Sequence, residues 1–150
     1  MTEKLKQIIK EEVGKLPKEM REAINSLDWG NVAEEIGKKY LLNDIEVNDF
    51  QVETLLILTG IQRDDSYAKN IEDNVGTSKD EAEKIAEEAN QKIFTQIYNA
   101  LTENIKKNIG NKNPDWKQNL NFVLSGGDYS VFAETRDDTI NTTSPSPDKG

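Results

Sequence analysis

The chain of 150 residues is long enough for one ordinary domain. Its 28 acidic side chains outnumber its 19 basic ones, and the resulting charge of −9 disfavours a general phosphate-binding surface. The chain contains no Cys and no His, which excludes thiol nucleophiles, imidazole bases, disulfides and the usual nitrogen- and sulfur-ligated zinc sites.

Apolar residues at helical spacing predict four helices within the first 60 residues. The first follows Thr2 as N-cap and ends at Gly14, the second begins at Pro17, and the third is capped by Asp28. The fourth, over 45–58, is apolar on most sides, so we expect it to be the most buried helix. The apolar positions are Leu5, Ile8, Ile9 and Val13, then Met20, Ala23, Ile24 and Leu27, then Val32, Ala33, Ile36 and Tyr40, and finally Val47, Phe50, Leu55 and Leu58.

Two further helices are predicted before residue 110. The stretch 64–66 caps a helix that ends at Gly76, and the pair Ser78 and Glu81 forms a capping box that starts a long helix over 78–109. The apolar stripe of this long helix advances mostly by four residues, unlike the 3.5-residue period of a left-handed coiled coil. We therefore expect it to pack within one chain. An oligomer is not indicated, and the oligomeric state stays open.

The composition changes near Gly110, where Asn, Ser, Thr, Gly and three of the four prolines begin to gather. Strand-forming residues on both sides of a Gly-Gly turn predict a small β-hairpin over 120–133, and the sequence beyond it is typical of a disordered end. We therefore divide the chain into a helical domain, 1–110, and a flexible tail, 111–150. The predicted fold is all-α, an irregular bundle of five or six helices with the long helix as its last member.

Familiar catalytic and metal-binding patterns are missing from the sequence. Adjacent acidic pairs point apart on a helix, and the stretch 72–81 does not place oxygen ligands at the alternate positions of an EF-hand loop. The glycines at 126–127 lack the Lys-Ser/Thr pair and the following helix of a phosphate-binding loop. We predict no catalytic, cofactor-binding or metal-binding residue, no cofactor, and no enzymatic activity.

Five aromatic residues are candidates for contact with a partner. Trp is enriched at the energetic centres of protein interfaces, and Trp116 lies in polar sequence, where it either pins the tail to the helical domain or anchors a partner. The candidates are Trp29, Trp116, Phe122, Tyr129 and Phe132.

The chain shows no signal-peptide pattern at its start, and its longest apolar run, 55–58, is far shorter than the ~20 residues of a membrane span. We therefore expect a soluble cytoplasmic protein with no membrane span and no direct contact with nucleic acid.

Residues from Leu16 to about Lys107 resemble a family of small, uncharacterised, all-helical bacterial proteins. The resemblance implies a bacterial helical domain and no particular activity. It rests on Leu16-Pro17, on Ala23-Ile24-Asn25-Ser26-Leu27-Asp28-Trp29, on Lys39-Tyr40, and on Glu53-Thr54-Leu55-Leu56-Ile57-Leu58-Thr59-Gly60.

The leading functional hypothesis is a non-enzymatic helical module that binds another protein, either through a groove between short helices or through the hairpin. Two alternatives stay open. The negative charge could mimic nucleic acid and block a basic enzyme, or a carboxylate cluster could hold a divalent ion for catalysis.

Overall fold

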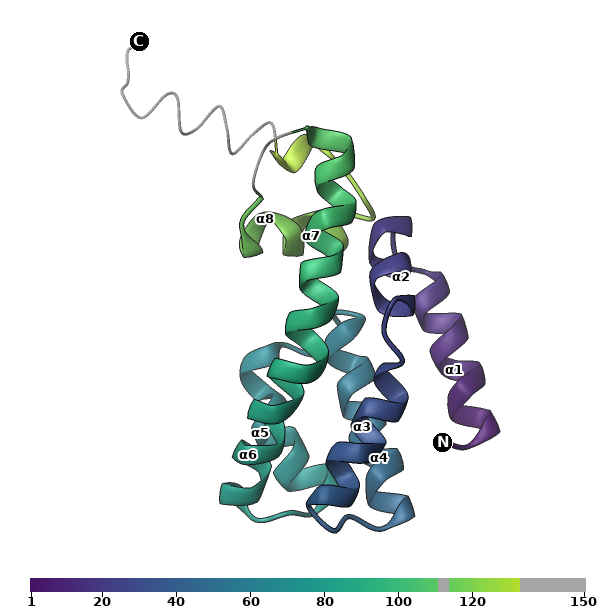
Figure 1. Cartoon of the computed structure of the whole chain (residues 1–150), viewed down its shortest axis with the longest axis vertical. Coiled ribbons are helices and arrows are strands. Elements are labelled where there is room, and N and C mark those ends of the chain that lie inside the picture. The colour runs from purple at the N-terminus through teal and green to yellow at the C-terminus, as the bar shows by residue number, and fades with distance from the viewer. Residues whose placement is uncertain (111–113, 133–150) are drawn as a thin grey trace.

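The computed structural model describes residues 1–110 and 114–132, and the regular secondary structure of these residues is all helical, with no strand among them. Eight α-helices and three short 3-10 or π segments follow one another in the chain (Figure 1). The prediction of an all-α fold is confirmed, but the predicted number of five or six helices is too low, because the described residues form eight. The predicted disordered end beyond the hairpin lies outside the described residues. None of the helices in the two described ranges is long and apolar enough to cross a membrane.

The first four helices begin where local caps place them. The Thr2 hydroxyl accepts a hydrogen bond from the Leu5 amide, and the Asp28 carboxylate accepts one from the Asn31 amide, so both predicted caps are confirmed. These helices are α1 (Glu3–Gly14), α2 (Lys18–Asn25), α3 (Trp29–Lys39) and α4 (Asp44–Leu58).

The second half of the fold is assembled from shorter pieces. Figure 1 shows α3 to α6 gathered at one end, with α7 extending from them and α2 and α8 on either side of α7. The elements are η1 (Asp64–Ser66), α5 (Tyr67–Asn70), the π-helical η2 (Ile71–Val75), α6 (Lys79–Ala89), the π-helical η3 (Asn90–Phe94), α7 (Thr95–Ile109) and α8 (Trp116–Leu124).

The prediction of one long α-helix over 78–109 is wrong, because the π-helical η3 separates α6 from α7. A stripe that advances by four residues drifts by about 40° per step around an α-helix, so a straight helix would carry it out of the core. The wider i to i+5 turn of a π-helix reverses that drift. As a result Ala89, Ile93 and Ile97 are all fully buried on the same side.

The prediction of a β-hairpin over 120–133 is also wrong, because α8 occupies the first half of that stretch. A capping box begins α8: the Asp115 carboxylate accepts from the Gln118 amide at 2.8 Å, and the Gln118 side chain accepts from the Asp115 amide at 2.9 Å. The helix therefore starts before the strand-like segment and continues through it.

The Gly-Gly turn exists, but it ends a helix instead of joining two strands. Gly126 and Gly127 have φ angles of 82° and 98°, and their amides donate to the carbonyls of Val123 and Phe122. The chain then returns toward α2 and α7, where Phe132 is buried.

A single hydrophobic cluster joins all of these elements. It extends from Val13 in α1 to Phe132, so the described residues 114–132, which the sequence analysis assigned to the tail, belong to the same core as the helical domain. Helix α4 has eight buried side chains, among them Phe50 and Leu58, as expected for the helix predicted to be the most buried.

Candidate interaction surface

Helix α8 buries a polar residue and exposes apolar ones. Asn119 is 3% exposed and faces the core together with Phe122. On the other face, Trp116, Leu120 and Leu124 are 43%, 36% and 61% exposed. Residues four apart share one side of a helix, so these three form a continuous apolar stripe. A contiguous apolar stripe of this kind makes this face of α8 a candidate site of interaction.

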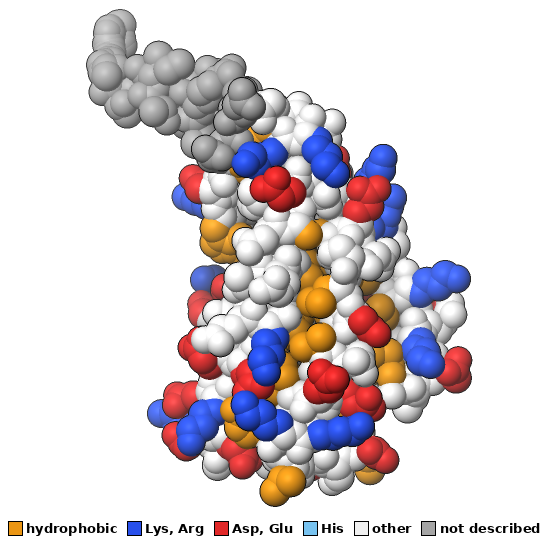
Figure 2. All heavy atoms as spheres, in the orientation of Figure 1, with side chains coloured by type: hydrophobic (Ala, Val, Ile, Leu, Met, Phe, Trp, Pro, Cys, Tyr) orange, Lys and Arg blue, Asp and Glu red, His pale blue; other side chains and the backbone are white. Residues whose placement is uncertain are grey.

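The stripe borders an apolar groove between α8, the end of α4 and the middle of α7. Tyr98 and Leu58 line its floor, around a cavity of about 20 Å³. Leu124 lies directly over Gly60, where an added Cβ would come within 3.3 Å of the leucine. Hydrophobic side chains also reach the surface at the left edge of Figure 2, at the height of α8 in Figure 1. We call this site, together with its exposed stripe, the α8 groove.

Trp116 packs on the helical domain and remains accessible. Its ring centroid is 4.3 Å from that of Tyr98, at an angle of 47°. Tyr98 in turn stacks on Phe94, which contacts the buried Tyr67 edge-on. This row of aromatic rings leads from the core to the surface and holds Trp116 at the rim of the α8 groove.

Of the other four predicted contact residues, three are core residues in the described structure. Trp29, Phe122 and Phe132 are 5%, 0% and 3% exposed, so none can meet a partner without a change in the fold. Tyr129 is half-buried. The structure does bring Phe122, Tyr129 and Phe132 together, with ring centroids between 4.7 and 6.0 Å apart.

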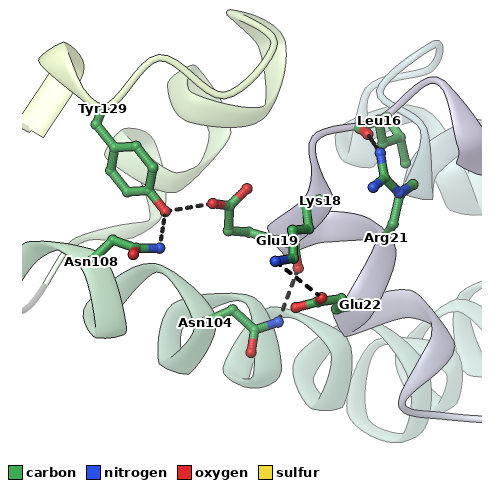
Figure 3. Close-up of polar contacts among 8 residues, drawn as sticks. All are labelled: Leu16, Lys18, Glu19, Arg21, Glu22, Asn104, Asn108 and Tyr129. Carbon is green, nitrogen blue, oxygen red and sulfur yellow. Dashed lines mark hydrogen bonds and ion pairs between the residues drawn. The ribbon is translucent and has the colours of Figure 1, made fainter.

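Tyr129 fastens the segment after α8 to two other helices (Figure 3). Its hydroxyl donates to Glu19 Oε2 in α2 at 2.6 Å and accepts from Asn108 Nδ2 in α7 at 2.6 Å. Burial and the bond to Glu19 raise the pKa of Tyr129 to about 12. Asn104 Nδ2 adds a bond to the Glu19 carbonyl, so α2, α7 and residues 125–132 form one unit around α8.

A second, acidic pocket lies next to the α8 groove, between η1–α5 and α6–η3. It has a volume of about 290 Å³, and Tyr67, Phe94 and Tyr98 line it together with four exposed carboxylates. Burial is the main cause that raises the pKa of Tyr98, and the negative charge of Asp64 adds to it. The four carboxylates are Asp64, Asp65, Glu83 and Glu87.

A separate ion-pair network joins α3 to α6. Glu88 accepts hydrogen bonds from Lys39 Nζ and Lys92 Nζ, each at 2.8 Å, and from the Tyr40 hydroxyl at 3.1 Å. The bond from Lys39, followed by that from Lys92, lowers the pKa of Glu88 to about 2. All four side chains satisfy one another, which is the arrangement of a structural contact between helices.

Residues 1–110 and 114–132 contain no group of three or more carboxylates arranged to hold a metal ion. The adjacent acidic pair Glu87 and Glu88 is split between the acidic pocket and the ion-pair network. The described carboxylates thus contribute a negative surface at the acidic pocket.

The sequence analysis identified Trp116 but missed Leu120, Leu124 and Tyr98 as parts of the surface. The spacing of 116, 120 and 124 after a capping box at Asp115 was the available signal for an amphipathic helix. The meeting of the acidic pocket and the α8 groove at Tyr98 has no sequence signal, because it joins η1, α6, α7 and α8 in space.

No protein-family model matches the chain, and neither the curated proteins nor the solved structures include a significant match to it. The surface is therefore interpreted from its own geometry and chemistry.

Proposed function

We propose that the protein is a non-enzymatic helical protein–protein interaction module, and that another protein binds it at the α8 groove. The observation that carries this proposal is the stripe of Trp116, Leu120 and Leu124, which α8 holds in solvent while it buries Asn119. Apolar surface of this kind is costly to leave in water, and a partner that covers it recovers the hydrophobic free energy.

Three features of the groove support binding of a protein. Trp116 is anchored on one side by Tyr98 and exposed on the other, as is typical of an interfacial anchor. The groove is built on packed helices, so little order must be gained on binding. Its cavity of about 20 Å³ is far below the size of an ordinary small-molecule site, so larger, shallower contacts are favoured.

One part of the proposal rests on a sequence pattern alone. The bacterial origin comes from the resemblance of residues 16–107 to a family of small helical proteins.

The test compares two variants that each remove two exposed apolar side chains. Leu120→Ser/Leu124→Ser removes most of the stripe. The control Leu41→Ser/Ile45→Ser changes Leu41, which is 89% exposed in the connection before α4, and Ile45, which is 75% exposed in the first turn of α4. Wild type and variants, first checked for equal helicity by circular dichroism, are used to capture partners from cells of the source organism. Each captured protein is then purified and titrated by calorimetry.

We expect one partner to bind wild type and the control variant within about twofold, and to bind the α8 variant at least about tenfold more weakly, which corresponds to ~1.4 kcal/mol. A partner that binds all three proteins equally would overturn the assignment of the site. If no captured protein binds wild type in purified form, the proposed function is wrong.

A further inference from the structure

The α8 groove and the acidic pocket share one side chain. Tyr98 lines both, with Trp116 packed against its ring at 4.3 Å on the groove side and Phe94 stacked at 6.1 Å. A ligand that lies along the α8 groove therefore reaches the acidic pocket without crossing any other helix. The two cavities form one surface that is apolar on one side and negative on the other.

The negative side has no cation within the pocket, and the lysines that share an adjoining hollow with Glu83 and Glu87 pair with other carboxylates: Lys84 with Asp80 and Lys92 with Glu88. No Lys or Arg lines the acidic pocket, and Arg63, which forms an ion pair with Asp65 at 3.3 Å, is 86% exposed at its side chain. Among the described residues, Asp64, Glu83 and Glu87 form no ion pair. Three carboxylates thus remain available to a cation from outside.

The pocket also suits a cation through its aromatic wall. The faces of aromatic rings attract ammonium and guanidinium groups, and this attraction grows when the cation is partly removed from water. Tyr98, which is half-buried, supplies such a ring, with the buried Tyr67 and Phe94 packed behind it. Long Lys and Arg side chains can extend their apolar stems over rings of this kind while their charged ends meet the carboxylates.

The backbone form of the ligand follows from the fold. The described residues contain no strand, so they present no sheet edge to which an extended chain could add. A helix satisfies its own backbone hydrogen bonds and needs only side-chain contacts from a groove. The side chains on the surface of such a helix then determine whether it fits. To fit this surface, the helix must carry apolar side chains next to positively charged ones.

We propose that the ligand of this surface is a basic amphipathic helix of another protein. Its apolar face lies on Trp116, Leu120 and Leu124, and a Lys or Arg side chain at its edge enters the acidic pocket over Tyr98. This inference rests on the proposed function and adds the chemical class of the partner. The net charge of −9 draws such a segment toward the protein before contact, and the two side chains on α6, Glu83 and Glu87, then fix its direction along the groove.

Three synthetic peptides and three variants of the full chain test the inference. The probes are an amphipathic Leu/Lys helix of about four turns, the same sequence with Glu in place of Lys, and a Ser/Lys peptide of equal charge with no leucine. The acidic variant is Glu83→Gln/Glu87→Gln and the groove variant is Leu120→Ser/Leu124→Ser. The control Glu3→Gln/Glu11→Gln removes the same charge from exposed positions of α1, a helix that packs on α2 and α4.

Affinity is measured by fluorescence anisotropy of the labelled peptides at low and at physiological salt. We expect wild type to bind the Leu/Lys helix about tenfold or more tightly than either other probe. The acidic variant should lose about fivefold to tenfold for that probe, and the control variant less than about twofold, because two exposed carboxylates on α1 act only through screened, long-range attraction.

The outcomes separate this inference from the proposed function. If the acidic variant binds like wild type while the groove variant does not bind, the α8 groove is confirmed as the binding site and the inference of a basic partner is wrong. If the groove variant binds like wild type and all charge-reducing variants weaken equally, the protein acts as a polyanion, and both proposals are wrong. Failure of wild type to prefer the Leu/Lys helix also overturns the inference.

Discussion

Replacement of Asn119 by leucine tests whether the buried polar residue of α8 lowers the stability of the fold. The Asn119 side chain is 3% exposed, and its Nδ2 donates to the Thr102 hydroxyl at 2.9 Å. Its Oδ1 is buried and has no hydrogen-bond partner among the described residues. Asn119→Leu has nearly the same side-chain shape and removes that unpaired acceptor.

The size of the effect follows from two opposing contributions. A buried acceptor without a partner costs about 1–3 kcal/mol, and its removal returns that amount to the folded state. The lost hydrogen bond is worth about 0.5–1.5 kcal/mol, and the half-buried Thr102 hydroxyl can turn to water. We therefore expect Asn119→Leu to unfold with a free energy about 1 kcal/mol higher than that of wild type.

The measurement is urea unfolding followed by circular dichroism, with the midpoint raised and the slope unchanged. Thr102→Val is the matched control, because it leaves the buried Asn119 amide without its acceptor and should lower the free energy of unfolding by about 1–3 kcal/mol. If Asn119→Leu instead destabilises the protein by about 1 kcal/mol or more, Asn119 Oδ1 is satisfied in the folded protein, and the reasoning about α8 is refuted.

Two other contacts give independent predictions. The pKa of Glu88, about 2, lies below the ordinary value of 4.5, so its network stabilises the fold fully above pH 4.5 and progressively less as the pH falls toward 2. The side chains of Lys39 and Lys92 are 60% and 54% exposed, so solvent screens both ion pairs. Glu88→Gln should therefore lower the free energy of unfolding by about 1 kcal/mol at pH 7 and by almost nothing at pH 2. If urea unfolding shows the same loss at both pH values, the assigned role of the Glu88 network is contradicted. Tyr129→Phe removes the donor to Glu19 and should lower the free energy of unfolding by about 1–2 kcal/mol. Amide exchange should then speed up over 116–132, and unchanged exchange there would show that the Phe122 cluster alone holds the segment.

The helix starts were predictable because their causes are local. Thr2, Asp28 and Ser78 each accept a hydrogen bond from the amide three residues ahead, and that geometry depends on four consecutive residues. For the same reason the positions of Gly76 and Gly126 at positive φ could be expected from the sequence. Such signals place the ends of helices without any knowledge of their neighbours.

The course of the chain between helix ends depends on packing, which the spacing of apolar residues alone does not determine. The apolar spacing of residues 78–109 does not by itself show where a π turn would lie. In the structure the turn lies at η3, between α6, which packs on α3 and α5, and α7, which packs on α2. The acidic pocket is non-local in the same way, because η1 and α6 meet there only after the chain leaves η2 at Gly76, which has a positive φ angle, and enters α6. Neither could be read from composition or period.

The wrong prediction for α8 and the proposed function have one physical cause. Leu120, Phe122, Val123 and Leu124 are strand-forming or apolar residues beside a Gly-Gly turn, and this composition predicted a strand. In the helix the same residues lie on different faces, with Phe122 in the core and Leu120 and Leu124 exposed. A helix selected only for stability would carry polar residues at those two exposed positions, and the stretch would then contain fewer of the residues that favour a strand. Conflict between local pattern and global fold is expected where residues serve binding instead of folding, so the feature that misled the prediction is itself evidence for the α8 groove.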